Sequence, residues 1–328
     1  MTIIFATNDL ADFPGGILST TAGDFRSAYV SSAIQVSDGN SLTPIQISSS
    51  RIPPVAGDVT WLHFQYRKEI NIGNANADGN MLFELVSGTG VKIMDFDVDN
   101  AILNCRLFGS STLTTAVTGN GPSTGITAFD IKIDLTSDIT IEVWINQALV
   151  HDESQAWTSS PGNPEYILWR GFDIDSGGTP SKQWVSELIV ADEDTQNMGL
   201  SEMIPDAAGN YSAWKGDHVE TGDNDLGTGA SSSSTGQKLS SDLSSFGGPS
   251  SSALRALVIL NKASTRGGTV GDLRNFLRIG GADFNGAALG VGETIKNYVT
   301  VYDQNPDTSS DWDTTDFAGV EVGIESLA

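Results

Sequence analysis

The sequence predicts an all-β protein that contains two β-sandwich domains. Glycine is abundant, at 36 of 328 residues, and only 18% of the residues are charged, as is typical of β proteins rich in turns. Apolar residues recur at every second position in short segments that turn-forming residues separate. No segment shows the sustained apolar period of about 3.6 residues that marks an amphipathic helix. A chain of this length predicts two domains, each able to bury a core.

The first domain is expected to be a β-sandwich whose strands lie between residues 28 and 195. In the segment VTWLHFQYRKEI, Leu62, Phe64 and Tyr66 fall on one face and the residues between them on the other, as a strand with one buried face requires. The segment DITIEVWINQALV repeats this pattern and predicts a turn at Asn146 and Gln147.

The domain boundary is expected near residue 200, which gives domains 1–199 and 200–328. The segment KQWVSELIVADEDT predicts a closing strand that ends in acidic residues. Further on, the serine-rich stretch 227–252 has the composition of a flexible linker. Only about 75 residues follow it, which is few for an independent sandwich, so we expect this stretch to be an internal loop of the second domain.

Charge and cysteine content narrow the range of partners and compartments. Seventeen basic and 41 acidic residues give a net charge of -24, which argues against binding to nucleic acid or to an anionic membrane surface. Cys105 is the single cysteine, so no disulfide can form within the chain. The first residues lack the basic start of a secretory signal, and no apolar run approaches the ~18 residues of a membrane span. We therefore expect synthesis in a cytoplasm and no membrane insertion.

Three segments carry a resemblance to a known family: WVSELIVADEDTQNMGLSEMIPDAAGNYSAW, LRNFLRIGG and the C-terminal NPDTSSDWDTTDFAGVEVGIES. Together they resemble virion structural proteins of tailed bacteriophages. The resemblance implies a concanavalin A-like (laminin G-like) jelly roll followed by a smaller C-terminal β domain. It also implies a place in the virion after assembly in a host cytoplasm, other virion proteins as partners, and a homo-oligomer, for which a trimer is one candidate. It supplies no catalytic residues.

The C-terminal segment also predicts structure from its own residues. Pro306 fixes φ after Asn305 in a turn, and Trp312 is large enough to cover the end of a sandwich. Val320 and Val322 share one face of a final strand that completes a sheet. An exposed Trp312 that binds sugar is the alternative.

A partial calcium motif is the single candidate for a metal site. Asn74, Asn76 and Asp78 in NANADGN match the opening of a calcium-binding loop. The first position is Asn rather than Asp, and Leu85 stands where the closing glutamate belongs. A plain Asx-Gly loop explains the same residues without metal. We therefore expect no cofactor, with Ca²⁺ as the one ion to consider.

The segment DFDVDN offers a possible catalytic site. Strand alternation would place Asp95, Asp97 and Asp99 on one face, and glycoside cleavage needs a protonated carboxyl group beside an ionised one. The alternative is a solvated turn at DVDN, residues 97–100, between two strands. The glutamate-centred pattern of concanavalin A-like glycosidases does not occur, so we expect a protein that is not an enzyme.

A ligand surface is predicted in the segment HDESQAWTSSPGNPEYILWRGFDIDSGG. Sugars are held by aromatic faces together with hydrogen bonds from carboxylates and amides. The candidate residues of this kind are Trp157, Trp169, Asp173 and Asp175. Core packing of Trp169 is the stronger alternative, whereas Trp157 is expected to be exposed.

The resemblance implies a virion structural protein, and together with the observations above it favours a tail-associated or fibre-like appendage that binds host surface glycans. One alternative is a capsid decoration or attachment protein without a ligand. The other is a depolymerase that cleaves surface polysaccharide.

Overall fold

The computed structural model consists of β-strands with a single short helix in its described part, which confirms the all-β prediction. Contacts divide the chain into a first unit, Met1–Leu200, and a second unit, Ser201–Ala328. The structure describes residues 3–8, 12–13, 15–37, 47–48, 57–69, 80–99, 102–109, 111–117, 124–169, 172–173, 180–222, 228–249, 253–265 and 271–328.

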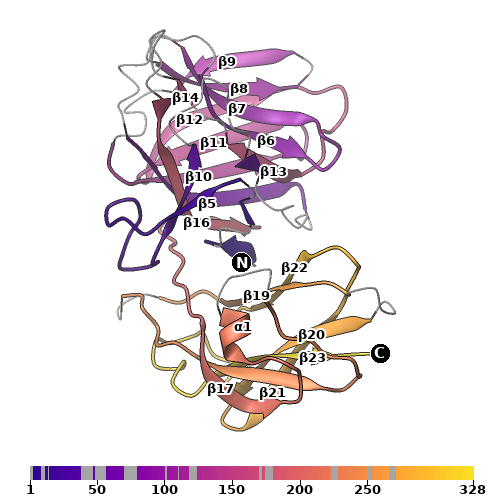
Figure 1. The fold of residues 1–328 in the computed structure, drawn as a ribbon. Coiled ribbons are helices and arrows are strands. Elements are labelled where there is room, and N and C mark those ends of the chain that lie inside the picture. Colours follow the sequence, from indigo (N-terminus) through magenta and orange to yellow (C-terminus); the bar gives the residue numbers. More distant parts are fainter. Residues whose placement is uncertain are drawn as a thin grey trace. The chain divides into compact units, whose positions relative to one another are not determined.

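The first unit is a β-sandwich of the jelly-roll kind with antiparallel strand pairing (Figure 1). Sheet A has eight strands: β12 (Ala148–Gln155), β11 (Ile139–Ile145), β10 (Thr127–Asp134), β5 (Val59–Lys68), β16 (Gln183–Ala191), β3 (Ala33–Ser37), β2 (Ile17–Ser19) and β1 (Ile3–Thr7), which pairs with β16. Sheet B has six strands: β4 (Ile47–Ser48), β13 (Pro164–Trp169), β6 (Asn80–Ser87), β7 (Lys92–Asp99), β8 (Ile102–Phe108) and β9 (Thr112–Ala116). A separate pair joins β14 (Phe172–Asp173) to β15 (Pro180–Ser181).

Aromatic side chains from both sheets fill the interior of the first unit. Phe64 of sheet A lies with its ring centroid 5.3 Å from Phe83 of sheet B and 5.2 Å from Phe129 of its own sheet. The three rings are fully buried or nearly so. The inward positions are those that alternation predicts for β5, and the predicted turn at Asn146 and Gln147 joins β11 to β12 with positive φ at both residues.

The second unit packs a five-stranded sheet, sheet C, against a two-stranded pair. The strand order of sheet C is β17 (Pro205–Ser212), β18 (Lys238–Leu243), β23 (Glu321–Ser326), β20 (Asp272–Ile279) and β21 (Ala282–Gly290). The pair consists of β19 (Leu257–Ala263) and β22 (Lys296–Tyr302), and the short helix α1 covers His218–Gly222. The final strand β23 thus has a neighbour on each side in the sheet.

The serine-rich stretch 227–252 is not wholly the loop that its composition predicts, because it contains the strand β18. Ser240 and Ser241 of this strand are buried. The Ser240 hydroxyl donates to Glu321 Oε2 at 2.5 Å and accepts from the Tyr211 amide at 3.0 Å. Since these partners satisfy the hydroxyl, the serine can lie inside a sheet at little cost.

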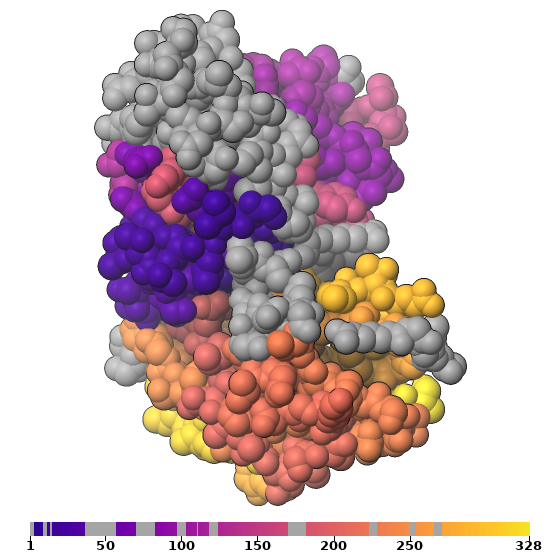
Figure 2. All heavy atoms as spheres, viewed as in Figure 1, coloured from indigo at the N-terminus to yellow at the C-terminus, as the bar shows by residue number. Residues whose placement is uncertain are grey.

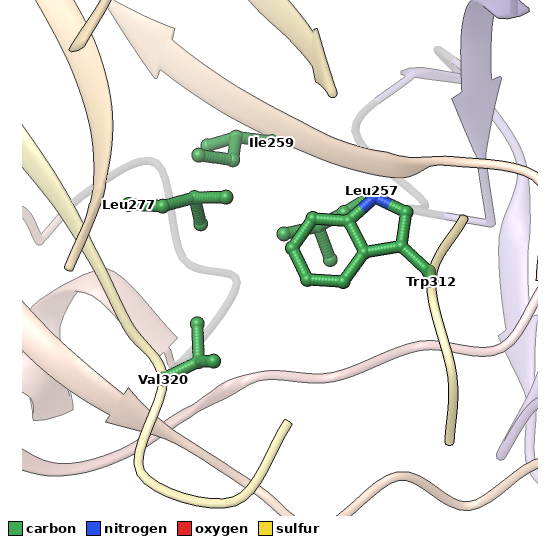
Figure 3. Close-up of a cluster of buried hydrophobic side chains, with 5 residues drawn as sticks. All are labelled: Leu257, Ile259, Leu277, Trp312 and Val320. Atoms are coloured by element: carbon green, nitrogen blue, oxygen red, sulfur yellow. The ribbon is translucent and has the colours of Figure 1, made fainter. Parts of the chain in front are cut away.

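Trp312 lies in the core of the second unit and is only 4% exposed. It belongs to a cluster with Leu257, Ile259, Leu277 and Val320 (Figure 3). Its indole N–H donates to the Tyr302 carbonyl at 2.7 Å, so the buried polar atom has a partner. The expectation that Trp312 covers a sandwich core is confirmed, and the alternative of an exposed sugar-binding Trp312 is wrong.

Replacing Trp312 tests how much this cluster contributes to the stability of the second unit. We expect Trp312→Ala to lower the free energy of unfolding of the second unit by about 3–5 kcal/mol, because it removes a large buried ring and leaves a cavity. Denaturant unfolding followed by circular dichroism measures the change. Trp157→Ala, at a half-buried position, is the control and should change the unfolding free energy by about 1 kcal/mol or less. Equal effects of both substitutions would contradict the assignment.

Candidate functional site

Trp169, one of the predicted ligand contacts, lies in the core of the first unit. Its side chain at the end of β13 has 0% exposure. The indole centroid is 5.0 Å from that of Phe64 and 5.1 Å from that of Phe83. The prediction that Trp169 contacts a ligand is therefore wrong, because its ring fills the space between the sheets.

Of the other predicted ligand and metal residues, the structure describes Trp157 and the backbone of Asp173. Trp157 follows β12 and is half-buried, so part of its ring reaches solvent. The backbone of Asp173 belongs to β14. The remaining candidates lie outside the described residues: Asp175 of the ligand set, and Asn74, Asn76 and Asp78 of the calcium loop.

Asp95 lies in the strand β7 and is fully buried. Because β7 extends to Asp99, residues 97–99 belong to a strand rather than to the solvated turn that was expected at residues 97–100. Arg106 Nε donates to Asp95 Oδ1 at 2.6 Å, and Arg106 Nη2 donates to Oδ2 at 3.0 Å. Lys92 Nζ adds an ion pair to Oδ2 at 3.1 Å. Two cations thus hold both oxygens of Asp95, which favours a structural ion pair over the proton transfer that glycoside cleavage needs.

A group of aromatic and charged side chains on the outer face of sheet A was not predicted from the sequence. We call it the tryptophan patch, and it consists of Trp61, Lys132, Glu142 and Trp144. The rings of Trp61 and Trp144 are stacked, with centroids 5.2 Å apart and planes inclined by 22°. Lys132 lies beside Trp61 on β5 and opposite Glu142 on β11, to which it donates at 2.6 Å. Four side chains from three adjacent strands thus meet on one face.

Alternation along the strands places the tryptophan patch outward. Ile141 and Val143 on β11 point inward and are fully buried, so Glu142 and Trp144 point to the opposite face. Trp61 is 8% exposed, whereas Trp144 is half-buried and presents part of its ring to solvent. The hydrogen bond from Lys132 to Glu142 is the largest cause of the raised pKa of Lys132, which keeps it cationic at neutral pH.

The patch has the chemistry that sugar binding uses. An exposed aromatic face packs against the apolar C–H faces of a sugar ring, and a neighbouring ammonium and carboxylate offer hydrogen bonds to its hydroxyls. The sequence does contain one signal for this patch. Glu142 and Trp144 alternate with the apolar residues Ile141 and Val143, which places them on the outer face of the strand. The contact with Trp61 depends on pairing with a distant strand, which no local pattern shows.

A buried hydrogen-bond network lies next to the patch on the same face. His63 Nδ1 lies 2.8 Å from Asp130 Oδ1, which also accepts from Thr195 Oγ1 at 3.0 Å. Gln65 Nε2 lies 3.0 Å from His63 Nε2. This network assigns the proton to His63 Nδ1 and leaves Nε2 as an acceptor for the amide. Both nitrogens of the imidazole are engaged within sheet A, and Asp130 ties the sheet to the segment after β16 through its hydrogen bond from Thr195.

An N-terminal segment covers another part of this face. Arg26 Nε donates to Glu187 Oε1 at 2.9 Å, and the Leu200 amide donates to Glu187 Oε2 at 3.2 Å. In Figure 2 the indigo atoms of the N-terminal residues form a continuous part of the visible surface of the first unit. The tryptophan patch lies on other strands of sheet A, namely β5, β10 and β11.

Among the described residues, no group of three or more His, Cys, Asp or Glu side chains is placed to hold a metal ion. No helix in the described part of the chain is long and apolar enough to span a bilayer.

Basic residues of the second unit form ion pairs within sheet C. Arg274 Nη2 lies 2.5 Å from Glu325 Oε2, and Arg278 Nη1 lies 2.7 Å from Asp283 Oδ1. Lys238 Nζ lies 2.7 Å from Asp283 Oδ2. These cations have partners in their own sheet, which favours a role in holding the strands together.

Lys68 is an ionisable group on the inner face of sheet A, and its side chain is 1% exposed. It follows Phe64 and Tyr66 on the same face of β5. Burial lowers the pKa of Lys68 to about 7. The native state therefore releases this proton at a pH where the unfolded chain still holds it, so the cost of burying the cation is greatest below pH 7.

A pH titration tests this burial. Between pH 7 and pH 10 the unfolded chain binds the Lys68 proton more strongly than the native state, so the unfolding free energy should rise with pH by at most about 1.4 kcal/mol per unit from this group. Lys68→Met should lack that rise. Chemical unfolding of both proteins in buffers without carboxylates measures the difference, and parallel pH curves would refute the burial of a titrating lysine.

Comparisons with known proteins find similarity of fold only. No family model matches the chain, and no curated protein matches it. The solved structure titled "Cellulose induced protein, Cip1" aligns with a TM-score of 0.42 and 14% identity, over 58% of this chain and 97% of the other. An endo-β-1,4-glucuronan lyase from the fungus Trichoderma reesei aligns with a TM-score of 0.45 and 16% identity, over 60% of this chain and 100% of the other. The receptor-binding domain of botulinum neurotoxin type G aligns with a TM-score of 0.39 and 10% identity, over 59% of this chain and 44% of the other.

Proposed function

We propose that this protein is a non-enzymatic structural protein of a tailed-phage virion, and that its first unit binds a host surface glycan. In this proposal the protein is part of a tail-associated or fibre-like appendage. Its partners are other virion proteins and further copies of the same chain, assembled in the host cytoplasm.

The tryptophan patch is the observation that carries the glycan-binding part. Trp144 presents a partly exposed ring that rests on the buried ring of Trp61, so its position is fixed before any ligand arrives. A fixed aromatic surface loses little conformational entropy on binding. The adjacent ion pair of Lys132 and Glu142 supplies a donor and an acceptor at the edge of that surface.

The hydrogen-bond partners of the carboxylates near the patch favour glycan binding over glycan cleavage. Glycoside cleavage uses two carboxyl groups, one as acid and one as base or nucleophile. Near the patch, Glu142 accepts from Lys132, and Asp130 accepts from Thr195 and contacts His63. Both carboxylates are therefore already engaged by other side chains of the protein, whereas cleavage needs one carboxyl group to give a proton to the substrate.

The virion part of the proposal rests on the sequence resemblance. The net charge of -24 suits a protein that is soluble at high copy number before assembly. Most of the ion pairs described in the second unit connect strands of sheet C, which supports a mechanical rather than a catalytic role for that unit.

Binding to a glycan array of bacterial surface polysaccharides tests the first part. We expect wild-type protein to bind at least one glycan and Trp144→Ala to lose at least about tenfold in affinity, because the substitution removes the exposed stacking surface. Trp214→Ala, at a half-buried position in the second unit, is the matched control and should retain binding. Absence of binding to any glycan would favour a decoration protein, and release of reducing ends would show a depolymerase.

Mass spectrometry of purified particles tests the second part. We expect the chain in virions that have been washed in high salt, because assembly through an extended protein interface survives the screening of surface charges. Antibodies against the first unit should label such particles. Its absence from washed virions would overturn the proposed location.

A further inference from the structure

Two polar side chains face each other inside the first unit, at one end of the central strands of sheet A. Lys68 is the last residue of β5, Gln183 is the first of β16, and the two are directly opposite in the antiparallel register. Opposite residues project to the same face with Cβ atoms about 5 Å apart. Since Phe64 on β5 contacts rings of sheet B, alternation points Lys68 and Gln183 into the space between the sheets.

These groups are buried without hydrogen-bond partners. Lys68 is 1% exposed and Gln183 is 0% exposed. Lys68 Nζ, Gln183 Oε1 and Gln183 Nε2 make no hydrogen bond, and neither does the hydroxyl of Tyr66, two residues before Lys68 on the same face. A buried amide or ammonium group without a hydrogen-bond partner destabilises the folded state. Several such groups side by side indicate that something binds them.

The unpartnered atoms indicate which chemistry would complete the site. The ammonium and the amide NH₂ group supply several donors, and the phenol supplies another, so donors exceed acceptors. One lysine brings one positive charge. A carboxylate matches both features, because it carries one negative charge and offers two oxygens that accept several hydrogen bonds.

We propose that Lys68, Gln183 and Tyr66 form an internal binding site for one carboxylate group. The carboxylate belongs either to a small organic anion or to an acidic sugar. This site shares no residue with the tryptophan patch and lies on the opposite face of sheet A. Its existence therefore does not depend on the proposed glycan binding.

Thermal unfolding with added anions tests the site. The probes are sodium acetate, sodium glucuronate and the uncharged sugar glucose, each compared with sodium chloride at equal ionic strength. A ligand that binds only the native state raises the Tm in a saturable way. We expect a rise of several degrees with at least one carboxylate and none with glucose. Equal responses to acetate and glucuronate identify a small-anion site, and a response to glucuronate alone identifies an acidic-sugar site.

Two variants and a control show whether the response comes from this site. Lys68→Met replaces the buried cation by an apolar chain of similar length, so it should fold and lose the response. Gln183→Met provides the same test if Lys68→Met fails to fold. Lys182→Met changes an exposed lysine next to Gln183 and should keep the response. The proposal is overturned if no carboxylate raises the wild-type Tm, or if the rise persists in the variant that lacks the site.

Discussion

The pairing of β5 with β16 is the constraint on which the first unit depends. It joins residues 59–68 to residues 183–191, in the middle of sheet A. Because side chains alternate between faces, this register decides that His63 faces outward and Lys68 inward, and a shift by one residue would exchange them. The polar network of the outer face and the buried lysine of the inner face are thus consequences of one strand alignment.

A bulge in β16 interrupts this pairing and turns one side chain toward the N-terminal segment that contacts sheet A. The register shifts between Ser186 and Ile189, and Glu187 has a φ of 57°. This conformation is uncommon for a residue with a side chain, and bulges re-aim the side chains they contain. Here the carboxylate of Glu187 meets Arg26 and the Leu200 amide, which ties the N-terminal segment and the end of the unit to the sheet.

The sequence predicted features that depend on local pattern. The inward face of β5 and the turn at Asn146 and Gln147 follow from alternation and turn chemistry, and both are confirmed. The burial of Asp95 depends on Arg106 from the next strand, so no local pattern shows it.

Long-range contacts explain the other differences. The strand β18 in the serine-rich stretch is stabilised by Glu321 from the far end of the second unit. Likewise the stacking of Trp144 on Trp61 joins strands that are far apart in the sequence. For the serine-rich stretch, composition indicated a loop. For Trp144, periodicity predicted an outward position but not the contact with Trp61.

The central claim is that the tryptophan patch contacts a glycan, and the indole N–H signals of the seven tryptophans report on it directly. The measurement is a titration of ¹⁵N-labelled protein with host surface polysaccharide, followed by NMR. The account predicts that the signals of Trp144 and Trp61 shift with the polysaccharide, while the signal of the core residue Trp312 stays in place. Shifts confined to Trp157, or no shift of any indole signal, would contradict it.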